Sequence, residues 1–267
     1  MMARTGPRAR GFWAAAWLLL ACTVGLPATL QAAGLQVSNV LLEFQPTDTA
    51  QGLWLSNSGS VPLRAQARVQ QWVQAGGAEQ LEPTRTLTAS PPILEIAPGQ
   101  QQFIRVVRLQ QGAPAAEQAY RLLIDELPAD AAAATSGASS PGVQFLIRHS
   151  VPVFVLPQGG EALGGRRGVT DIAPLVAQVA RGAAADTHLE VRNSGSQRVR
   201  ISQLAFVDAQ NQSTPLVPGL LGYVLAGQQM RWPVALTAAQ WGTGGKLMAR
   251  LNDDLEPQRL ATVPALP

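Results

Sequence analysis

The sequence predicts an all-β protein made of two immunoglobulin-like β-sandwich domains. Three observations lead to this fold class: short runs in which apolar and polar residues alternate, turns rich in Gly, Pro and Asn between these runs, and a second half that repeats the pattern of the first. A period of two residues is what a half-buried β-strand requires. About seven such strands separated by turns are typical of an immunoglobulin-like sandwich.

The composition is that of a folded protein. The chain has 267 residues, of which 46% are hydrophobic and 14% are charged, so it can form a core and is unlike a disordered chain. Residues 1–33 carry three arginines and no acidic residue, so the formal net charge of +3 becomes zero once this segment is removed. No basic run with interleaved aromatic residues occurs, which argues against nucleic-acid binding.

Residues 1–33 have the order of a secretory signal peptide. The three arginines precede an apolar run at 12–21, and small residues follow up to Ala33. The apolar run is too short for a transmembrane helix. We expect Sec-type export with cleavage near Ala33. Cys22, the only cysteine, follows Leu19-Leu20-Ala21 as in a lipoprotein cleavage site, so a lipid anchor at Cys22 is the alternative.

The first half contains about seven predicted strands. The clearest is Leu63 to Gln70, in which apolar and polar residues alternate strictly. Residues 129–142 consist almost only of small and polar residues and predict a loop. The other strands are predicted at 34–44, 51–56, 91–96, 102–109, 119–127 and 143–155.

The predicted strand at 143–155 is the most informative. Its alternate positions form an apolar face broken only by His149: Val143, Phe145, Ile147, Val151, Val153 and Val155. Pro152 cannot donate a ladder hydrogen bond, so we expect this strand to be an edge strand, at least locally. Proteins normally protect long apolar edges. The strand therefore either has a hidden partner or functions in strand pairing, and an ordinary core strand is the alternative.

The second half repeats the theme of the first. The tetrapeptide at Asn57–Ser60 recurs at Asn193–Ser196, with predicted strands on both sides each time. Such a repeat indicates two related sandwiches. We place a linker in the Gly-rich segment 159–168, which gives domains at 34–158 and 169–267.

No catalytic set is recognisable. His149 and His188 are the only histidines, and neither has a second His or a Cys nearby, so a zinc site lacks ligands. Phosphate-binding loops and nucleophile elbows are absent from the sequence. We therefore predict no enzyme activity, no cofactor and no metal. A hydrolase whose residues converge from distant segments is the alternative.

Three arginines interrupt otherwise apolar strands: Arg105, Arg121 and Arg148. An arginine can bind a carboxylate through two charge-assisted hydrogen bonds. If their strands are neighbours, the three could form one anion site. For each arginine alone, a surface side chain whose stem covers apolar neighbours is the alternative.

Taken in order, these features resemble the periplasmic pilus-assembly chaperones of the chaperone–usher system, over about Gly34 to Pro267. Tyr120-Arg121 and the run at 148–154 are most similar to the divergent branch that serves archaic, spore-coat-type pili. The resemblance rests on the signal, Asn57 in a turn, Pro91-Pro92, Pro98-Gly99 followed by Phe103-Ile104-Arg105, Glu126-Leu127-Pro128 before a variable loop, the strand ending at Val153–Pro157, and Gly222–Gly227.

The resemblance implies two immunoglobulin-like domains in a boomerang arrangement, a periplasmic location, and pilin subunits and an outer-membrane usher as partners, with no small-molecule substrate. It also implies donor-strand complementation, in which the chaperone lends a strand to a subunit that lacks one. Val143, Phe145 and Ile147 would be the residues that fill the subunit's groove. Whether the free chaperone covers this strand by forming a dimer is left open.

One departure from the family concerns the subunit's C-terminal carboxylate. Well-studied members bind it with two basic residues, at positions that correspond to about Leu41 and Pro152, and neither is basic here. Arg121 and Arg148, with Arg105 third, are the candidate anchors, expected on the last strands of the first domain rather than in the cleft. The alternative to the chaperone is an exported two-sandwich protein with a structural or ligand-binding role.

Overall fold

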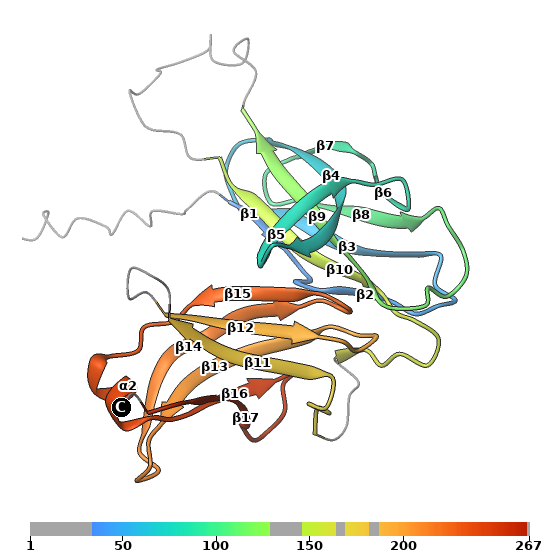
Figure 1. Ribbon diagram of the computed structural model, residues 1–267. Helices are drawn as coiled ribbons and strands as arrows, with labels where there is room; N and C mark the ends of the chain where they lie inside the picture. Colours follow the sequence, from blue (N-terminus) through green and yellow to red (C-terminus); the bar gives the residue numbers. More distant parts are fainter. Residues whose placement is uncertain (1–33, 129–145, 164–168, 182–186, 266–267) are drawn as a thin grey trace, which may run out of the picture. The chain divides into compact units, whose positions relative to one another are not determined.

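The computed structural model describes residues 34–128, 146–163, 169–181 and 187–265 (Figure 1). The signal peptide and the proposed donor residues Val143 and Phe145 lie outside these ranges. The described strands form two β-sandwiches, as the sequence predicts. The first contains β1 (Leu35–Val37), β2 (Leu42–Phe44), β3 (Ala50–Asn57), β4 (Leu63–Ala75), β5 (Ala78–Pro83), β6 (Leu87–Ser90), β7 (Ile93–Ile96), β8 (Gln101–Arg108), β9 (Gln118–Leu127) and β10 (Arg148–Val155).

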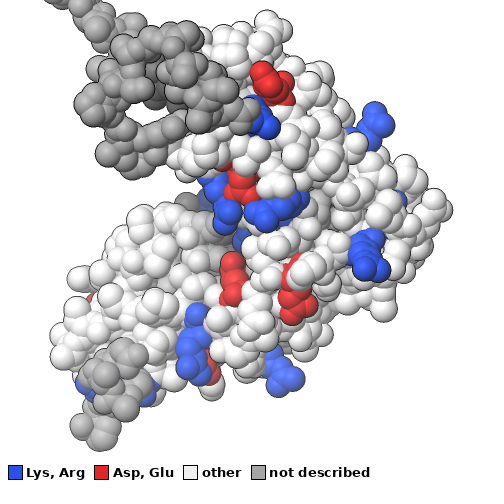
Figure 2. Space-filling view, turned by 90° about the horizontal axis from the view of Figure 1, so that it is seen from above, with Lys and Arg blue, Asp and Glu red and all other residues white. Residues whose placement is uncertain are grey.

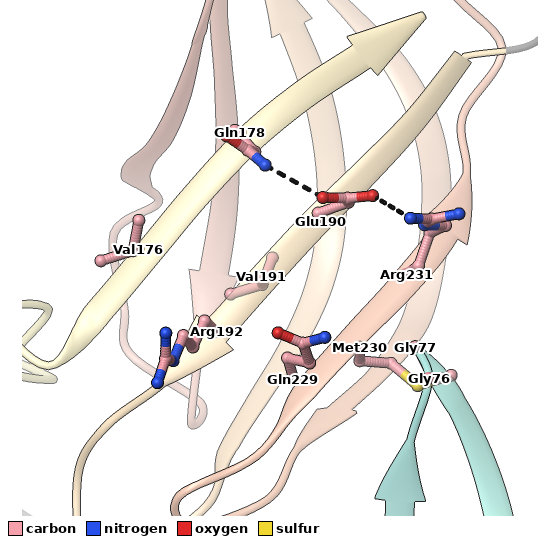
Figure 3. Close-up of a pocket in the computed structure, with 10 residues that line it drawn as sticks. All are labelled: Gly76, Gly77, Val176, Gln178, Glu190, Val191, Arg192, Gln229, Met230 and Arg231. Carbon is pink, nitrogen blue, oxygen red and sulfur yellow. Dashed lines mark hydrogen bonds and ion pairs between the residues drawn. The ribbon is translucent and has the colours of Figure 1, made fainter. Parts of the chain in front are cut away.

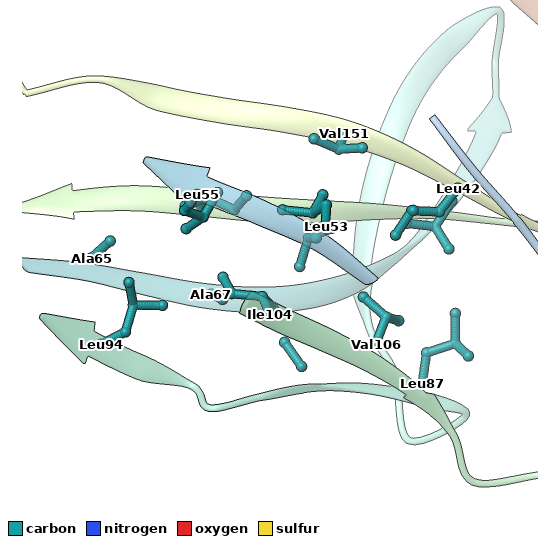
Figure 4. Packing of buried hydrophobic residues seen from close by; sticks show 14 of the residues in the cluster. Leu42, Leu53, Leu55, Ala65, Ala67, Leu87, Leu94, Ile104, Val106 and Val151 are labelled. Carbon is teal, nitrogen blue, oxygen red and sulfur yellow. The ribbon is translucent and has the colours of Figure 1, made fainter. Parts of the chain in front are cut away.

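The first sandwich consists of two sheets. One has the order β1-β3-β8-β6, and the other has the order β2-β10-β9-β4-β5, with β7 also paired to β4. Alternate residues of each strand enter the core between the sheets: on β8, Ile104 and Val106 are buried whereas Arg105 is exposed. Figure 4 shows the packing of these apolar side chains, including Leu53, Leu55 and Val151.

The strand predicted at 34–44 is divided between the two sheets. β1 pairs with β3 in one sheet, and β2 pairs with β10 in the other. The alternation of apolar residues is broken at Ser38 and Asn39, and the Ser38 hydroxyl accepts a hydrogen bond from the Trp54 backbone N–H. The chain therefore crosses from one sheet to the other at this point, and the single predicted strand is wrong.

The second sandwich also has two sheets, ordered β11-β12-β15 and β14-β13-β16-β17. Its core includes Leu189, Ile201 and Leu247, all fully buried. A single described turn of helix, α2 (Ala238–Thr243), begins with a capping box between Thr237 and Gln240. The strands are β11 (Leu175–Arg181), β12 (Thr187–Asn193), β13 (Val199–Val207), β14 (Ser213–Val224), β15 (Gln229–Pro233), β16 (Gly245–Leu251) and β17 (Gln258–Val263).

The repeated tetrapeptide performs the same structural task in both sandwiches. Asn57 is buried; its amide N–H groups donate to Val61 O and Ile96 O, and its Oδ1 accepts from Gly59 N. Asn193 makes the corresponding three bonds, to Gln197 O, to Val224 O and from Gly195 N. Each asparagine thus closes its own turn and links it to a neighbouring segment, as expected for side chains that replace backbone partners in turns.

Candidate functional site

Strand β10 has a fully paired side and a partly open side. It pairs antiparallel with β9 along its whole length, from Arg148 opposite Asp125 to Val155 opposite Gln118. On its other side it pairs with β2 only at Val153–Val155. Among the described residues, no strand pairs with 148–152 on that side. This half of β10 therefore presents an edge of the kind that can pair with another chain.

The apolar face of β10 is buried at one end and exposed at the other. Val151, Val153 and Val155 are in the core of the first sandwich. Ile147 continues the same alternation, but 40% of its surface is exposed. Its carbonyl accepts a hydrogen bond from Glu126 N, so the main chain is still held by the β9 side at this point. The Ile147 side chain is thus apolar and accessible outside the core, while its main chain is hydrogen-bonded to β9.

The three candidate arginines do not form one site. Arg105 lies on β8, in the sheet opposite to β9 and β10. Arg121 on β9 and Arg148 on β10 are on neighbouring strands, but Arg148 is paired with Asp125, four residues along β9 from Arg121. At roughly 3.3 Å per residue, this offset separates their backbones by about 13 Å. Each arginine therefore has to be judged by its own surroundings.

Arg148 is already compensated by an acid. It forms an ion pair with Asp125, whose other carboxylate oxygen lies 2.6 Å from Arg68. Burial tends to raise the pKa of Asp125, but hydrogen bonds and charges from Arg148 and Arg68 outweigh it and hold that pKa below the usual value. The Arg148 side chain is also 61% exposed. Its charge is shared with Asp125 and screened by water.

Arg121 is in a different situation. It is directly opposite Pro152 on β10, so it stands one strand away from the position where the family has a basic residue. Its guanidinium carbon lies 3.6 Å from the centroid of the Trp72 ring. Its side chain is only 16% exposed, and the nearest acid, Glu79, is 3.7 Å away. With the described residues it makes no hydrogen bond. Burial lowers the pKa of Arg121.

The ring beneath Arg121 belongs to a small aromatic cluster separate from both cores. The cluster consists of residues from both sandwiches: Trp72, Ala119, Phe154, Tyr223 and Leu225, with Leu41 packed against them. Trp72 and Tyr223 meet edge to face, with ring centroids 5.6 Å apart. Arg121 therefore lies on β9 of the first sandwich and beside residues of the second sandwich.

A second arginine covers the same cluster and serves as a contrast. The guanidinium carbon of Arg198 lies 3.5 Å from the centroid of the Phe154 ring. Unlike Arg121, Arg198 is almost completely buried and forms ion pairs with both Glu117 and Glu43. Burial raises the pKa of Glu117, although Arg198 acts in the opposite direction. Arg198 thus joins the two sandwiches through its two terminal nitrogens, whereas its Nε is buried without a described partner.

Gln74 fixes the backbone of the second sandwich at this cluster. Its side-chain N–H donates to Tyr223 O at 2.7 Å, and its Oε1 accepts from Leu225 N at 3.0 Å. Gln74 is itself buried. These paired bonds hold Tyr223 in a defined position relative to Trp72.

A recess elsewhere on the molecule lacks reactive groups. Its volume is about 280 Å³, and it lies between the turn at Gly76-Gly77 and the sheet of β11, β12 and β15 (Figure 3). Its one carboxylate, Glu190, accepts a hydrogen bond from Gln178 and pairs with Arg231. The hydrogen bond from Gln178, together with Arg231, lowers the pKa of Glu190. A carboxylate held in this way is a poor general acid.

Charge and metal-binding residues give no other site. The face in Figure 2 carries acidic and basic side chains close together rather than a wide area of one sign. Within the described ranges, no three His, Cys, Asp or Glu side chains are grouped to hold a metal ion. In the same ranges, no helix has the length and apolar character needed to cross a membrane.

Comparison with known proteins identifies the class. Residues 34–161 match the family model described as pili and flagellar-assembly chaperone, PapD N-terminal domain. This match covers the whole first sandwich, including β9, β10 and Arg121. Residues 34–161 therefore match the N-terminal domain of the pilus-assembly chaperones. No curated protein matches the sequence.

Solved structures share the fold of both sandwiches. The CsuC–CsuE chaperone–tip adhesion subunit pre-assembly complex from archaic Csu pili of Acinetobacter baumannii matches with a TM-score of 0.61 and 22% identity, over 85% of this chain and 97% of that chain. The Salmonella enterica SafA pilin–SafB chaperone complex matches with a TM-score of 0.53 and 17% identity, over 85% of this chain and 95% of that chain. The Pseudomonas aeruginosa CupB2 chaperone matches with a TM-score of 0.52 and 14% identity, over 84% of this chain and 97% of that chain.

The sequence pointed to β10 and Arg121 but not to what surrounds them. Trp72 lies on β4 just beyond the alternating run predicted at Leu63 to Gln70, and its ring lies under the Arg121 guanidinium. Tyr223 was noticed only as part of a family motif. The pairing of Arg198 with Glu117 joins residues 81 positions apart, and no local pattern predicts it.

Proposed function

We propose that this protein is a periplasmic chaperone that binds pilin subunits by donor-strand complementation and delivers them to an outer-membrane usher. The observation that carries the proposal is the partial pairing of β10, which β9 holds along 148–155 whereas β2 covers only Val153–Val155. A subunit strand could hydrogen-bond to the open side of 148–152. In this arrangement main-chain bonds give affinity, and alternate side chains give specificity.

The side chains support the same role. Ile147 is apolar, exposed and aligned with core residues Val151 and Val153, so it could enter a groove of a bound subunit. Val143 and Phe145 continue this alternation in the sequence, and we propose them as the next groove-filling residues. The fold similarity to a chaperone–tip adhesion subunit complex and to a chaperone–pilin complex fits this proposal.

We propose Arg121 as the anchor for the subunit's C-terminal carboxylate. It is mostly buried, and its described ion pair, to Glu79, is long at 3.7 Å. It is also opposite Pro152 on β10, the position where well-studied members of the family carry a basic residue. Arg148 is a weaker candidate because Asp125 already holds it. Arg105 is the weakest because it lies in the opposite sheet. The exported form begins after a Sec signal peptide cleaved near Ala33.

The test is co-purification of the tagged protein from periplasm with the pilin-like products of neighbouring genes. Phe145→Asp combined with Ile147→Asp places charges on the donor face and should abolish a stoichiometric partner in a folded protein. Ile93→Asp is the matched control, because Ile93 is 54% exposed on β7, away from β10. Retention of the partner by the double variant, or absence of a partner in the wild type, would favour the structural-sandwich alternative.

A further inference from the structure

The aromatic cluster around Arg121 has more hydrogen-bond donors than acceptors. The guanidinium of Arg121 makes no hydrogen bond with the described residues. The indole N–H of Trp72 is buried without a partner. The hydroxyl of Tyr223 also bonds to no described residue, although only 8% of this residue is exposed. Buried tyrosine hydroxyls and tryptophan N–H groups usually have partners. Of these three groups only the Trp72 N–H is buried without a partner, and beside it the Arg121 and Tyr223 donors could bind an anionic or carbonyl ligand.

Tyr223 is placed to act together with Arg121. Its ring packs edge to face on Trp72, and the guanidinium of Arg121 lies over the ring of the same Trp72. Gln74 donates a hydrogen bond of 2.7 Å to the Tyr223 backbone carbonyl, which fixes the main chain from which the phenol extends. The phenol is near enough to Arg121 to act on its charge, although burial has the larger effect on the pKa of Arg121.

The hydroxyl of Tyr223 is also open to a ligand. Its oxygen is not among the buried polar atoms that lack a partner, so solvent reaches it. By contrast, the other tyrosine, Tyr120, is buried in the first core and donates its hydroxyl to Gln118 Oε1 at 3.0 Å. Tyr223 therefore has a free donor at the surface of the cluster, whereas Tyr120 does not.

We infer that the Tyr223 hydroxyl donates a second hydrogen bond to the subunit carboxylate bound by Arg121, so that residues from both sandwiches form one carboxylate site. This inference rests on the proposed function of Arg121. A guanidinium and a phenol hydroxyl offer donors to both carboxylate oxygens, and such charge-assisted bonds are among the strongest in proteins. The second sandwich then contributes directly to recognition of the subunit's end.

The experiment measures the binding of synthetic peptides that correspond to the C-terminal strand of the neighbouring pilin, ending either in a free carboxylate or in an amide. Wild type should prefer the carboxylate form. Tyr223→Phe keeps the ring and its packing on Trp72 but removes the hydroxyl, and it should lower the carboxylate-to-amide affinity ratio about fivefold to tenfold. Tyr120→Phe is the control and should leave the ratio unchanged. Thermal unfolding of each variant verifies folding.

The outcomes separate the inference from the function on which it rests. If Arg121→Gln abolishes the preference for the carboxylate and Tyr223→Phe keeps the full wild-type ratio, the role of Tyr223 is refuted and the anchor stands. If wild type binds both peptides equally, the carboxylate site itself is refuted. If wild type binds neither peptide nor the folded subunit, the proposed function fails as well.

Discussion

The guanidinium of Arg121 stacks on the indole of Trp72, with 3.6 Å between the guanidinium carbon and the ring centroid. This contact stabilises the charge through the ring and leaves the N–H groups at the edge of the guanidinium free. The nearest acid, Glu79, is 3.7 Å away and about two-fifths exposed. Arg121 is thus stacked on Trp72, and its described ion pair, to the partly exposed Glu79, is long, so a ligand carboxylate could compete for it.

Replacement of Arg121 should weaken subunit binding far more than replacement of Arg148. Arg121→Gln removes charge-assisted hydrogen bonds worth about 1.5–3 kcal/mol, so the dissociation constant should rise roughly 10- to 100-fold. Arg148→Gln should change it less than about threefold, because Arg148 already pairs with Asp125 and is well exposed. Titration calorimetry with the purified subunit measures both. Equal losses of subunit affinity in the two variants would show that the assignment of the anchor to Arg121 is wrong.

Glu79 should act as a weak competitor for Arg121. Its carboxylate is the only described acid near this guanidinium, and a subunit carboxylate would have to share or displace it. Glu79→Gln should therefore increase subunit affinity about threefold, and the gain should shrink at high salt. Glu82→Gln is the control on the same strand, since Glu82 is exposed and pairs with no described residue. A fall in affinity for Glu79→Gln would show that Glu79 supports the site instead.

The two repeated asparagines should contribute equally to stability. Asn57→Ala and Asn193→Ala each remove a buried side chain that makes three hydrogen bonds, and each should lower the free energy of unfolding by about 2–3 kcal/mol. Asn39→Ala should have little effect, because Asn39 is exposed and its side chain bonds to no described residue. Denaturant unfolding measures all three, and a neutral Asn193→Ala would refute the structural equivalence.

Glu117 should make stability depend on pH. Burial raises its pKa above the usual value of 4.5, so the folded state binds this proton more tightly than the unfolded state does. Its contribution is therefore fully present below pH 4.5 and is lost as the pH rises through the higher folded pKa. Glu117→Gln should flatten the profile of unfolding free energy in the window just above pH 4.5. If the slope of unfolding free energy against pH is unchanged in Glu117→Gln, the pH dependence of stability in this window comes from other groups.

The strand alternation made most of the fold predictable. β8 and β9 begin and end within one residue of their predicted bounds, and β4 begins at the predicted Leu63 but continues to Ala75. On β4 and β8 the alternation of buried and exposed residues is clear. β5 escaped prediction because all of its residues are exposed, so its sequence has no apolar alternation. The crossing of the chain between the two sheets near Ser38 was not predicted, because the two three-residue strands β1 and β2 resemble one interrupted strand in the sequence.

The candidate site was predictable only in part. The arginines stood out because they interrupt apolar strands, but their environments depend on contacts between distant residues. Arg148 on β10 pairs with Asp125 on the neighbouring strand β9, and Arg121 on β9 contacts Trp72 on the neighbouring strand β4. Tyr223 reaches the cluster from a different sandwich. Such distances in sequence leave no local period that would indicate which arginine is paired and which is free.

The central claim is that the open side of β10 pairs with the subunit's main chain. Hydrogen exchange of the chaperone, alone and in complex with the neighbouring pilin, tests this most directly. The account predicts that amide protection in the complex increases along 143–151, in which β2 does not pair with the described residues 148–151. Protection should change little at Val153–Val155, which are already paired on both sides. New protection confined to the recess at Gly76-Gly77 and β15, with 143–151 unchanged, would contradict strand donation.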